Sequence, residues 1–316
     1  MNEPEDEVYL IAGSEEVPGS SDIGHRDVWK TNDMNTWNQI VSDNTSSLPW
    51  SGGSGWTTIF HDDYIWQVTP YHVSKSTDGI NWTTTNANPP YSSYPGIRLG
   101  YSVDSWNGYL WITGGRANNT SLNDVWKSVD GVTWVQVTTS AAWGERKDHE
   151  SFVFNNKLWI MGGQDMSLSW PYYVNDIWSS LDGVNWTNEG LTPWYNKVDG
   201  ATVVHEGAIY TAGGGYGGVD TNDVWKSIDG ANWTQINTAA SWSARVLHDL
   251  VSYDGKLWVV GGRDVPTSYL DPVVPTNGQV WSSIDGINWS INTNTPWNNR
   301  SRHKVIVNEV QDIVAY

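Results

Sequence analysis

Basic residues recur in this sequence at a nearly fixed distance after an aromatic residue. In five segments, the aromatic side chain is followed three or four positions later by a cation: Arg98, Arg146, Lys197, Arg245 and Arg300. Three of these segments place a histidine three residues further on: His149, His248 and His303. A guanidinium binds carboxylate, sulfate or phosphate through paired hydrogen bonds, and an imidazole titrates near neutral pH. The pattern therefore predicts an anion-binding site or an acid–base site built from repeated segments.

These segments belong to a six-fold repeat that covers the chain. Each copy holds a β-rich run, an aspartate turn and a tryptophan, and the turn aspartates are Asp33, Asp78, Asp130, Asp182, Asp229 and Asp285. The interval between them is near 50 residues, which is typical of β-propeller blades. Because one such unit cannot bury its own faces, the repeat predicts a single closed domain over residues 1–316.

One copy, residues 143–186, shows the strands expected in each unit. The segments 149–154, 158–163 and 175–180 are rich in strand-forming residues, and a fourth strand opens at 184 after an Asp-Gly turn. Residues 303–307 align with the first of these strands, whereas 7–13 align with the second. We therefore expect the C-terminal strand to complete blade one and close the ring. The last five residues, 312–316, also resemble a second strand and compete with 7–13 for that place.

Three features together resemble the kelch repeat of the galactose oxidase-like propellers. They are an apolar strand that ends in Gly-Gly, a strand with Asp-apolar-Trp, and a tryptophan eight residues later. The resemblance covers essentially the whole chain and implies an all-β, six-bladed β-propeller with four-stranded blades. It also implies that the loops before the first strand and after Gly-Gly share one face. Arg116 and Arg263, which directly follow Gly-Gly, would then join the five cations, together with Arg26 at the end of a variable loop.

The arginines are distributed unevenly for so acidic a chain. Seven of the eight map to this one face, although the net charge is −18. This predicts a basic mouth in an acidic shell, with an acidic glycan or a carboxylate-bearing peptide as its ligand. The alternative is structural, because Asp148, Asp199 and Asp249 stand beside these cations and could neutralise them.

Most of the 23 tryptophans are explained by the repeat. Twenty fall at positions that recur from blade to blade, which favours packing between blades over ligand binding. Trp170 is different, because it lies in a long variable loop beside Tyr172 and Tyr173. These three aromatic residues could stack on a sugar or peptide, or they could fasten the loop to its own scaffold.

Catalytic and cofactor motifs are absent from the sequence. Without cysteine, the copper centre of galactose oxidase with its Tyr–Cys link cannot form. No zinc or EF-hand spacing and no sialidase arginine motif is present, so we expect no cofactor and no metal. His149, His248 or His303, acting with an arginine, could still serve a kelch-type sugar isomerase or lyase acting on acidic sugars. The sequence favours a binding protein over an enzyme.

Charge and hydropathy restrict the class of partner. The net charge of −18 disfavours nucleic acid, and no segment is apolar enough for a membrane helix. The N-terminus lacks a signal peptide, so a secreted, periplasmic or cell-surface location would require that a signal was removed. The leading prediction is a non-catalytic propeller that binds an anionic glycan or a protein partner. A display or spacer domain within a larger bacterial surface adhesin is a further alternative.

Overall fold

The structure is a computed structural model of the chain. It describes residues 6–15, 23–43, 48–49, 57–92, 97–118, 120–166, 173–194, 197–216, 219–264, 278–292, 295–297 and 299–308. No helix in these ranges is long and apolar enough to cross a membrane.

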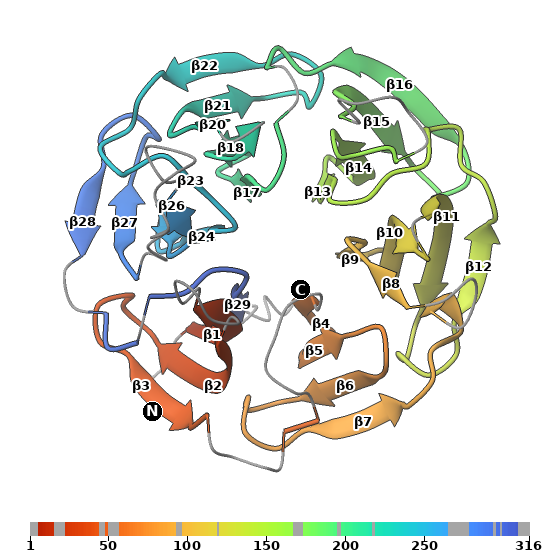
Figure 1. Cartoon of the computed structure of the whole chain (residues 1–316), viewed down its shortest axis with the longest axis horizontal. Coiled ribbons are helices and arrows are strands. Elements are labelled where there is room, and N and C mark those ends of the chain that lie inside the picture. Colours follow the sequence, from red (N-terminus) through yellow and green to blue (C-terminus); the bar gives the residue numbers. More distant parts are fainter. Residues whose placement is uncertain are drawn as a thin grey trace, which may run out of the picture.

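Six four-stranded antiparallel sheets stand like blades around a central axis (Figure 1). The predicted all-β, six-bladed propeller is confirmed. Blade one contains β29 (Lys304–Asn308), β1 (Glu7–Glu15), β2 (Ile23–Thr31) and β3 (Asn38–Val41). Blade two contains β4 (Thr57–His61), β5 (Tyr64–Val68), β6 (Val73–Ser76) and β7 (Thr83–Asn86), and the 3-10 turn η1 (Pro90–Ser92) follows it. Blade three contains β9 (Ser102–Trp106), β10 (Tyr109–Ala117), β11 (Thr120–Ser128) and β12 (Val135–Thr138), with β8 (Arg98–Leu99) beside the end of β10.

The other three blades repeat this order from the channel outwards. Blade four contains β13 (Glu150–Phe154), β14 (Lys157–Met161), β15 (Asp176–Ser180) and β16 (Trp186–Leu191). Blade five contains β17 (Ala201–His205), β18 (Ala208–Ala212), β21 (Val224–Ser227) and β22 (Thr234–Asn237), with the short pair β19 (Gly215–Tyr216) and β20 (Val219–Asp220). Blade six contains β24 (Asp249–Tyr253), β25 (Lys256–Val260), β27 (Val280–Ser283) and β28 (Ser290–Asn292), with the short pair β23 (Arg245–Val246) and β26 (Arg263–Asp264).

The ring is closed by the two ends of the chain. Strand β29 pairs antiparallel with β1, with Glu7 opposite Asn308 and Ile11 opposite Lys304. The C-terminal strand is therefore the innermost strand of blade one, as predicted, and 7–13 form its second strand. The competing segment 312–316 lies outside the described residues. Closure leaves no unpaired inner edge at this seam, which protects the ring from edge-to-edge association.

The hydrophobic core is divided into six clusters, each between two neighbouring blades. In one of them, Trp66 and Val68 of blade two pack with Val103 and Leu110 of blade three. Another joins Val8 and Leu10 of blade one to Trp258 and Val260 of blade six. Since each blade buries its faces only against its neighbours, stability depends on completing the circle.

The repeated Asp-Gly turn serves this packing directly. The Asp130 carboxylate accepts hydrogen bonds from the backbone N–H groups of Val132 and Thr133, at 2.9 and 2.8 Å. Gly131 has φ +67°, and a β-carbon there would overlap the ring of Trp66 in the preceding blade. Gly183 meets Trp111 in the same way. The glycine is therefore required both for the turn and for the close approach of two blades.

The aromatic residue before each innermost strand packs on the tryptophan that follows the turn. Trp143 meets Trp186, Trp242 meets Trp289, and Trp297 meets Trp37, all edge to face. In blade three, Tyr91 makes this contact with Trp134, with ring centroids 4.8 Å apart. Tyr94, the aromatic residue four positions before Arg98 in the sequence, lies outside the described residues. These contacts support a structural role for the recurrent aromatic residues.

Candidate functional site

The fold brings together the two sets of loops that the sequence placed on one face. Backbone pairing joins Arg116, after Gly-Gly, to Leu99 in the segment before the innermost strand of blade three. In blade six, Arg263 pairs in the same way with Val246. The segments that carry the predicted cations therefore surround one end of the channel, which we call the mouth.

Four of the five repeated cations are engaged in buried or nearly buried ion pairs within their own blades. Their partners are the aspartates of the Asp-x-Trp strands. The N–O distances are 2.7 Å for Arg98–Asp124, 2.7 Å for Arg146–Asp176, 2.6 Å for Lys197–Asp223 and 2.7 Å for Arg300–Asp27. Each aspartate also accepts a hydrogen bond from the indole N–H of the tryptophan two residues later. These cations fasten the mouth loop to the third strand, so the structural alternative describes them better than ligand binding does.

The fifth cation, Arg245, is equally buried but faces Gln279 where the other four cations face aspartate. Its guanidinium donates to the carbonyl oxygen of Gly261 at 2.8 Å and to Gln279 Oε1 at 3.4 Å. Burial lowers the pKa of Arg245 to about 10, although the charge of Asp264 opposes this. Arg245 therefore carries a buried charge without the bidentate carboxylate found in blades one, three and four.

The three histidines are held between glycine pairs. His149 is packed against Gly163 of its own blade and Gly114 of the preceding one, where β-carbons would lie within 3.0 Å of it. Burial and the charge of Arg146 lower the pKa of His149 to about 3. Burial also lowers the pKa of His303 to about 3 and that of His248 well below its usual range. The lowered pKa values favour the neutral form of all three imidazoles near pH 7, which argues against their use as general acids.

A ring of residues with left-handed backbone forms the inner rim of the mouth. Gly100, Asp148, Asp199, Leu247 and Arg302 stand two residues after each cation, with φ between 51° and 64°. Backbone hydrogen bonds connect them around the ring: Asp148 N–H to Gly100 O at 2.8 Å, Leu247 N–H to Asp199 O at 2.9 Å, and Arg302 N–H to Leu247 O at 3.0 Å. Non-glycine residues in this conformation are uncommon and concentrate at functional sites. The side chains at this rim differ from blade to blade, unlike the cations behind them.

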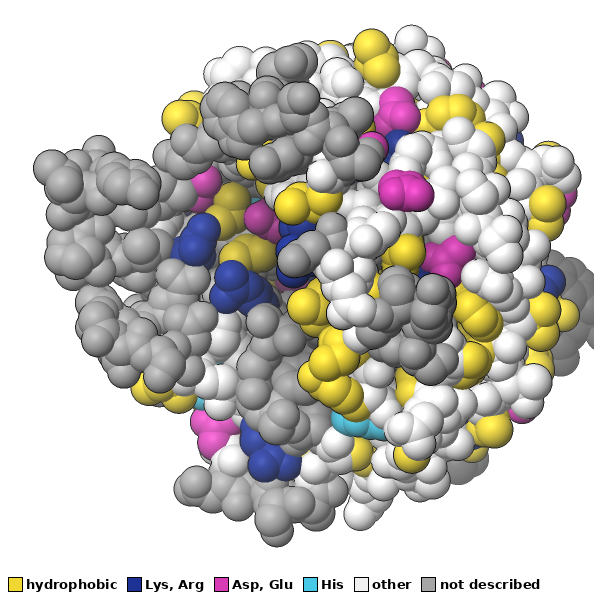
Figure 2. All heavy atoms as spheres, turned by 45° about the vertical axis from the view of Figure 1, so that its right-hand side comes forward, with side chains coloured by type: hydrophobic (Ala, Val, Ile, Leu, Met, Phe, Trp, Pro, Cys, Tyr) yellow, Lys and Arg dark blue, Asp and Glu magenta, His cyan; other side chains and the backbone are white. Residues whose placement is uncertain are grey.

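The rim borders a cavity of about 650 Å³ at the mouth of the channel. Four carboxylates line it, and they are Asp148, Glu150, Asp199 and Asp249. Three cations also line it, and they are Arg116, Arg302 and Lys304. Basic and acidic side chains both lie in the hollow of the space-filling view (Figure 2). The predicted basic mouth is therefore mixed in charge, because Arg98, Arg146, Lys197 and Arg300 form ion pairs behind the rim while carboxylates line the cavity.

Burial raises the pKa values of three of the cavity carboxylates, Glu150, Asp199 and Asp249. The pKa of Glu150 rises to about 7, although the charge of Lys304 opposes the effect. Burial raises the pKa of Asp199 to about 6, and the negative charge of Asp148 adds to the rise. A carboxyl with such a pKa can donate or accept a proton near neutral pH.

Comparisons with known proteins support the fold and leave the family open. No protein-family model matches the chain, and no curated protein matches it. Among solved structures, 349 chains match. One of them, described as the structure of YjhT, has a TM-score of 0.66 and 18% sequence identity, over 81% of this chain and 88% of the YjhT chain. At this identity the similarity shows the propeller fold alone.

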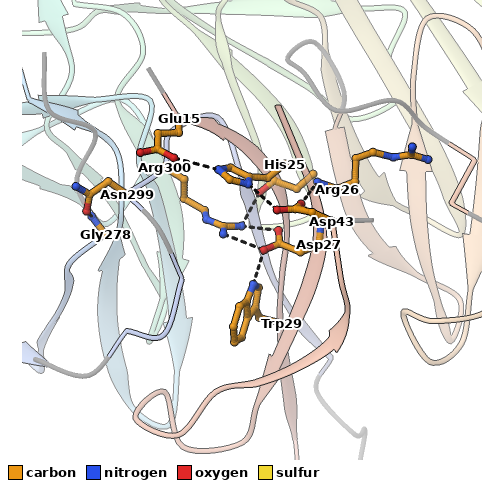
Figure 3. A network of polar contacts seen from close by, with 10 residues as sticks. Glu15, His25, Arg26, Asp27, Trp29, Asp43, Gly278, Asn299 and Arg300 are labelled. Carbon is orange, nitrogen blue, oxygen red and sulfur yellow. Dashed lines mark hydrogen bonds and ion pairs between the residues drawn. The ribbon is translucent and has the colours of Figure 1, made fainter. Parts of the chain in front are cut away.

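A network of polar contacts in blade one contains residues of the kinds that bind metal ions (Figure 3). Among the described residues, His25, Asp27 and Asp43 bring one ligand atom each within 4.8 Å of the others. Both Asp27 oxygens accept hydrogen bonds from Arg300, at 2.7 and 2.9 Å. Asp43 accepts from the backbone N–H of Arg26 at 2.6 Å and lies 2.9 Å from His25 Nδ1. The carboxylate oxygens of Asp27 and Asp43 are therefore engaged in hydrogen bonds with groups of the protein, so this cluster does not fit a metal site.

The remaining predicted residues lie in several environments. Arg26 donates to the carbonyl oxygen of Leu48 at 3.0 Å, and Arg263 is half-buried at the mouth. Tyr173 forms a backbone bridge with Gln164, whereas Trp170 and Tyr172 lie outside the described residues. Sequence reasoning overlooked Arg302, Glu150 and Lys304, although each stands two or four residues after a repeated cation. The residue types at these positions differ from blade to blade, and this difference was the sequence feature that could have pointed to them.

Proposed function

We propose that this propeller binds a small anionic sugar, or the anionic end of a glycan, in the cavity at the mouth of its channel. The observation that carries the proposal is the lining of the 650 Å³ cavity, which combines guanidinium groups and carboxylates around a space of ligand size. Arg116 and Arg302 supply donors for a carboxylate, sulfate or phosphate group. Asp148 and Asp199 supply acceptors for sugar hydroxyl groups. The proposed mode of binding requires no cofactor.

The repeat pattern and the YjhT-like fold support placing the chain among the kelch-type, galactose oxidase-like propellers. In such a scaffold the blades are constant and the rim varies, which matches the constant ion pairs and variable rim side chains seen here. Function on a propeller resides in the site that the scaffold presents. We therefore base the ligand class on the cavity residues and not on the fold.

Calorimetric titration with a panel of uronic acids, sugar phosphates and sulfated sugars tests the proposal. We expect at least one to bind the wild type, and Arg116→Ala to weaken that binding about tenfold or more, since a hydrogen bond to a charged group contributes about 1.5–3 kcal/mol. Lys127→Gln is the matched control, because it removes a cation that stands over the Tyr109 ring, away from the cavity lining. Equal losses in the two variants, or no binding of any anionic sugar, would refute the glycan assignment. A protein captured through the same cavity would favour the protein-partner alternative.

An enzyme acting on acidic sugars, an isomerase or lyase, is the second candidate. It is favoured by the near-neutral pKa values of Glu150 and Asp199, which suit proton transfer near pH 7 better than the lowered pKa values of the buried histidines do. NMR spectra of uronic acid substrates incubated with the wild type and with Glu150→Gln would detect turnover. A conversion that the wild type performs and Glu150→Gln loses would establish catalysis, whereas unchanged spectra in both would leave binding alone.

Binding of glycans accords with a secreted, periplasmic or cell-surface location, either alone or within a larger adhesin. Fractionation of cells that express the full gene tests this location. Recovery only in the cytoplasm would contradict it.

A further inference from the structure

Blade five differs from blades one, three, four and six at the position three residues after the repeated cation. Three residues after the repeated cation, or at the equivalent place, the blades carry Tyr101, His149, His248 and His303, and all four side chains are buried. Blade five has Gly200 there. The bulky ring that elsewhere fills the space between neighbouring blades is missing at this point.

A recess of about 20 Å³ lies where that ring would be, between blades four and five. It shares Asp148, Glu150 and Gly200 with the channel cavity, so it forms a side extension of the mouth. The volume accommodates one water-sized group. The absence of the ring therefore makes the mouth asymmetric in size as well as in charge.

The lining of the recess is amphipathic. Met161, Trp194 and Val198 provide apolar surface, and Asp148 and Glu150 provide acceptors. Lys197 also lines the recess, and its ammonium group donates to Asp223 at 2.6 Å. A second anionic group is repelled by the two carboxylates, whereas a hydroxyl that donates a hydrogen bond is accepted. A hydroxymethyl group has both properties, since its methylene packs on apolar surface and its hydroxyl donates.

We propose that the recess beside Gly200 is a specificity subsite for the hydroxymethyl group of a bound sugar. This inference rests on the proposed function, in which the anionic group of the same sugar is bound by Arg116 and Arg302. The hydroxyl oxygen enters the recess and donates to Glu150 or Asp148, and the methylene lies at the entrance against Trp194. Because Gly200 has no side chain, the recess stays open to the hydroxymethyl group, and this opening selects sugars that carry one.

The experiment compares α-D-glucose 1-phosphate with α-D-xylose 1-phosphate, which differ only by the hydroxymethyl group. We expect the wild type to prefer the glucose derivative about tenfold in Kd, the lower range for one added group in a fitted pocket. Gly200→His should bind both equally, near the affinity of the xylose derivative. Gly200 does not have a left-handed φ, but a β-carbon there would lie 3.2 Å from the carbonyl oxygen of Gly213 and 3.3 Å from that of Ala212, so these neighbours must shift slightly. The melting temperature and circular dichroism spectrum check that the variant is folded.

The outcomes separate the two hypotheses. Binding of neither sugar phosphate by the wild type counts against the proposed function for these ligands and removes the basis of the subsite. Equal binding of both by the wild type leaves the function standing and overturns the subsite. A preference that persists in folded Gly200→His also overturns it, as does loss of both ligands. If the histidine variant does not fold, Gly200→Ala places one carbon at the edge of the recess, against the carbonyl oxygen of Gly213, and should reduce the preference.

Discussion

Arg300 and Asp27 form a bidentate ion pair across the seam where the two ends of the chain meet. The guanidinium donates to the two carboxylate oxygens at 2.7 and 2.9 Å, and both side chains are nearly inaccessible to solvent. The residues are 273 positions apart in the sequence. The pair therefore fastens the C-terminal strand to blade one in the same way that Arg98 and Asp124 fasten a blade to its own loop.

Removing the carboxylate at the seam should destabilise the ring strongly. We expect Asp27→Asn to lower the free energy of unfolding by about 3–5 kcal/mol, because it leaves a buried guanidinium without its counter-charge. Urea denaturation measures the loss. Lys30→Gln is the control, since it breaks the half-exposed pair with Glu7 and should cost less than about 1 kcal/mol. Similar losses in the two variants would show that the seam does not depend on the buried pair.

Supplying a carboxylate to Arg245 should stabilise blade six. We expect Gln279→Asp to raise the free energy of unfolding by about 1–3 kcal/mol at pH 7, since the aspartate would bind the guanidinium as in blades one, three and four. A carboxyl whose pKa is lowered by such a partner stabilises the fold above its unfolded pKa. The gain should therefore disappear as the pH falls through the lowered folded-state pKa. Gln279→Asn, which shortens the side chain without adding charge, should give no gain, and an equal gain from it would contradict the electrostatic explanation.

Trp134 should contribute to stability as a core residue. It is buried, its ring is edge to face with Tyr91, and its indole N–H donates to the carbonyl oxygen of Gly131 at 3.2 Å. Trp134→Ala should cost about 3–5 kcal/mol. Val129 precedes the same turn and is 61% exposed, so Val129→Ala should change stability by less than about 0.5 kcal/mol. A loss below about 1 kcal/mol in Trp134→Ala would disprove the core role.

Asp104 should make stability depend on pH. Burial raises the pKa of Asp104 to about 7, although the hydrogen bond from Ser151 opposes the rise. The folded state then binds a proton that the unfolded state has lost, so this contribution is present at low pH and is lost as the pH rises from about 4 to about 7. Asp104→Asn removes the dependence and keeps an acceptor for Ser151.

The measurement for Asp104 is the free energy of unfolding of both proteins at pH 5 and pH 8. Relative to the wild type, Asp104→Asn should be more stable at pH 8 than at pH 5, by at least about 1 kcal/mol. A difference that does not change between the two pH values would show that Asp104 titrates normally.

The repeat predicted the architecture closely because the residues that define a blade are local. The turn aspartates bind N–H groups two and three residues away, as Asp130 does with Val132 and Thr133. The tryptophan after each turn bonds to the turn glycine, as Trp134 does with Gly131. Such contacts recur at fixed sequence spacing, so they are visible in the pattern. Closure by 304–308 was predictable for the same reason, because that segment copies the first strand of a blade.

The candidate site was predicted less well because its residues are defined by contacts between distant segments. The spacing of Arg98, Arg146 and Arg300 placed them correctly near the mouth. Whether each guanidinium faces a ligand or an aspartate depends on the third strand of the same blade, which lies 26 to 30 residues downstream for Arg98 and Arg146. Arg302 lines the cavity from the left-handed ring and Glu150 from the first residue of β13, and neither position carries a sequence motif that marks it as cavity lining.

By itself, the sequence determined a six-bladed ring of four-stranded blades closed by its C-terminal strand, because short-range turns and periodic apolar residues encode each blade. Only the tertiary structure decided which charges remain for a ligand. Burial placed four of the five repeated cations in internal ion pairs, and the convergence of the rim segments left a mixed cavity with one recess at Gly200. Ion pairs and cavities depend on contacts between residues that are far apart in the sequence, so they are defined only in the folded, closed ring.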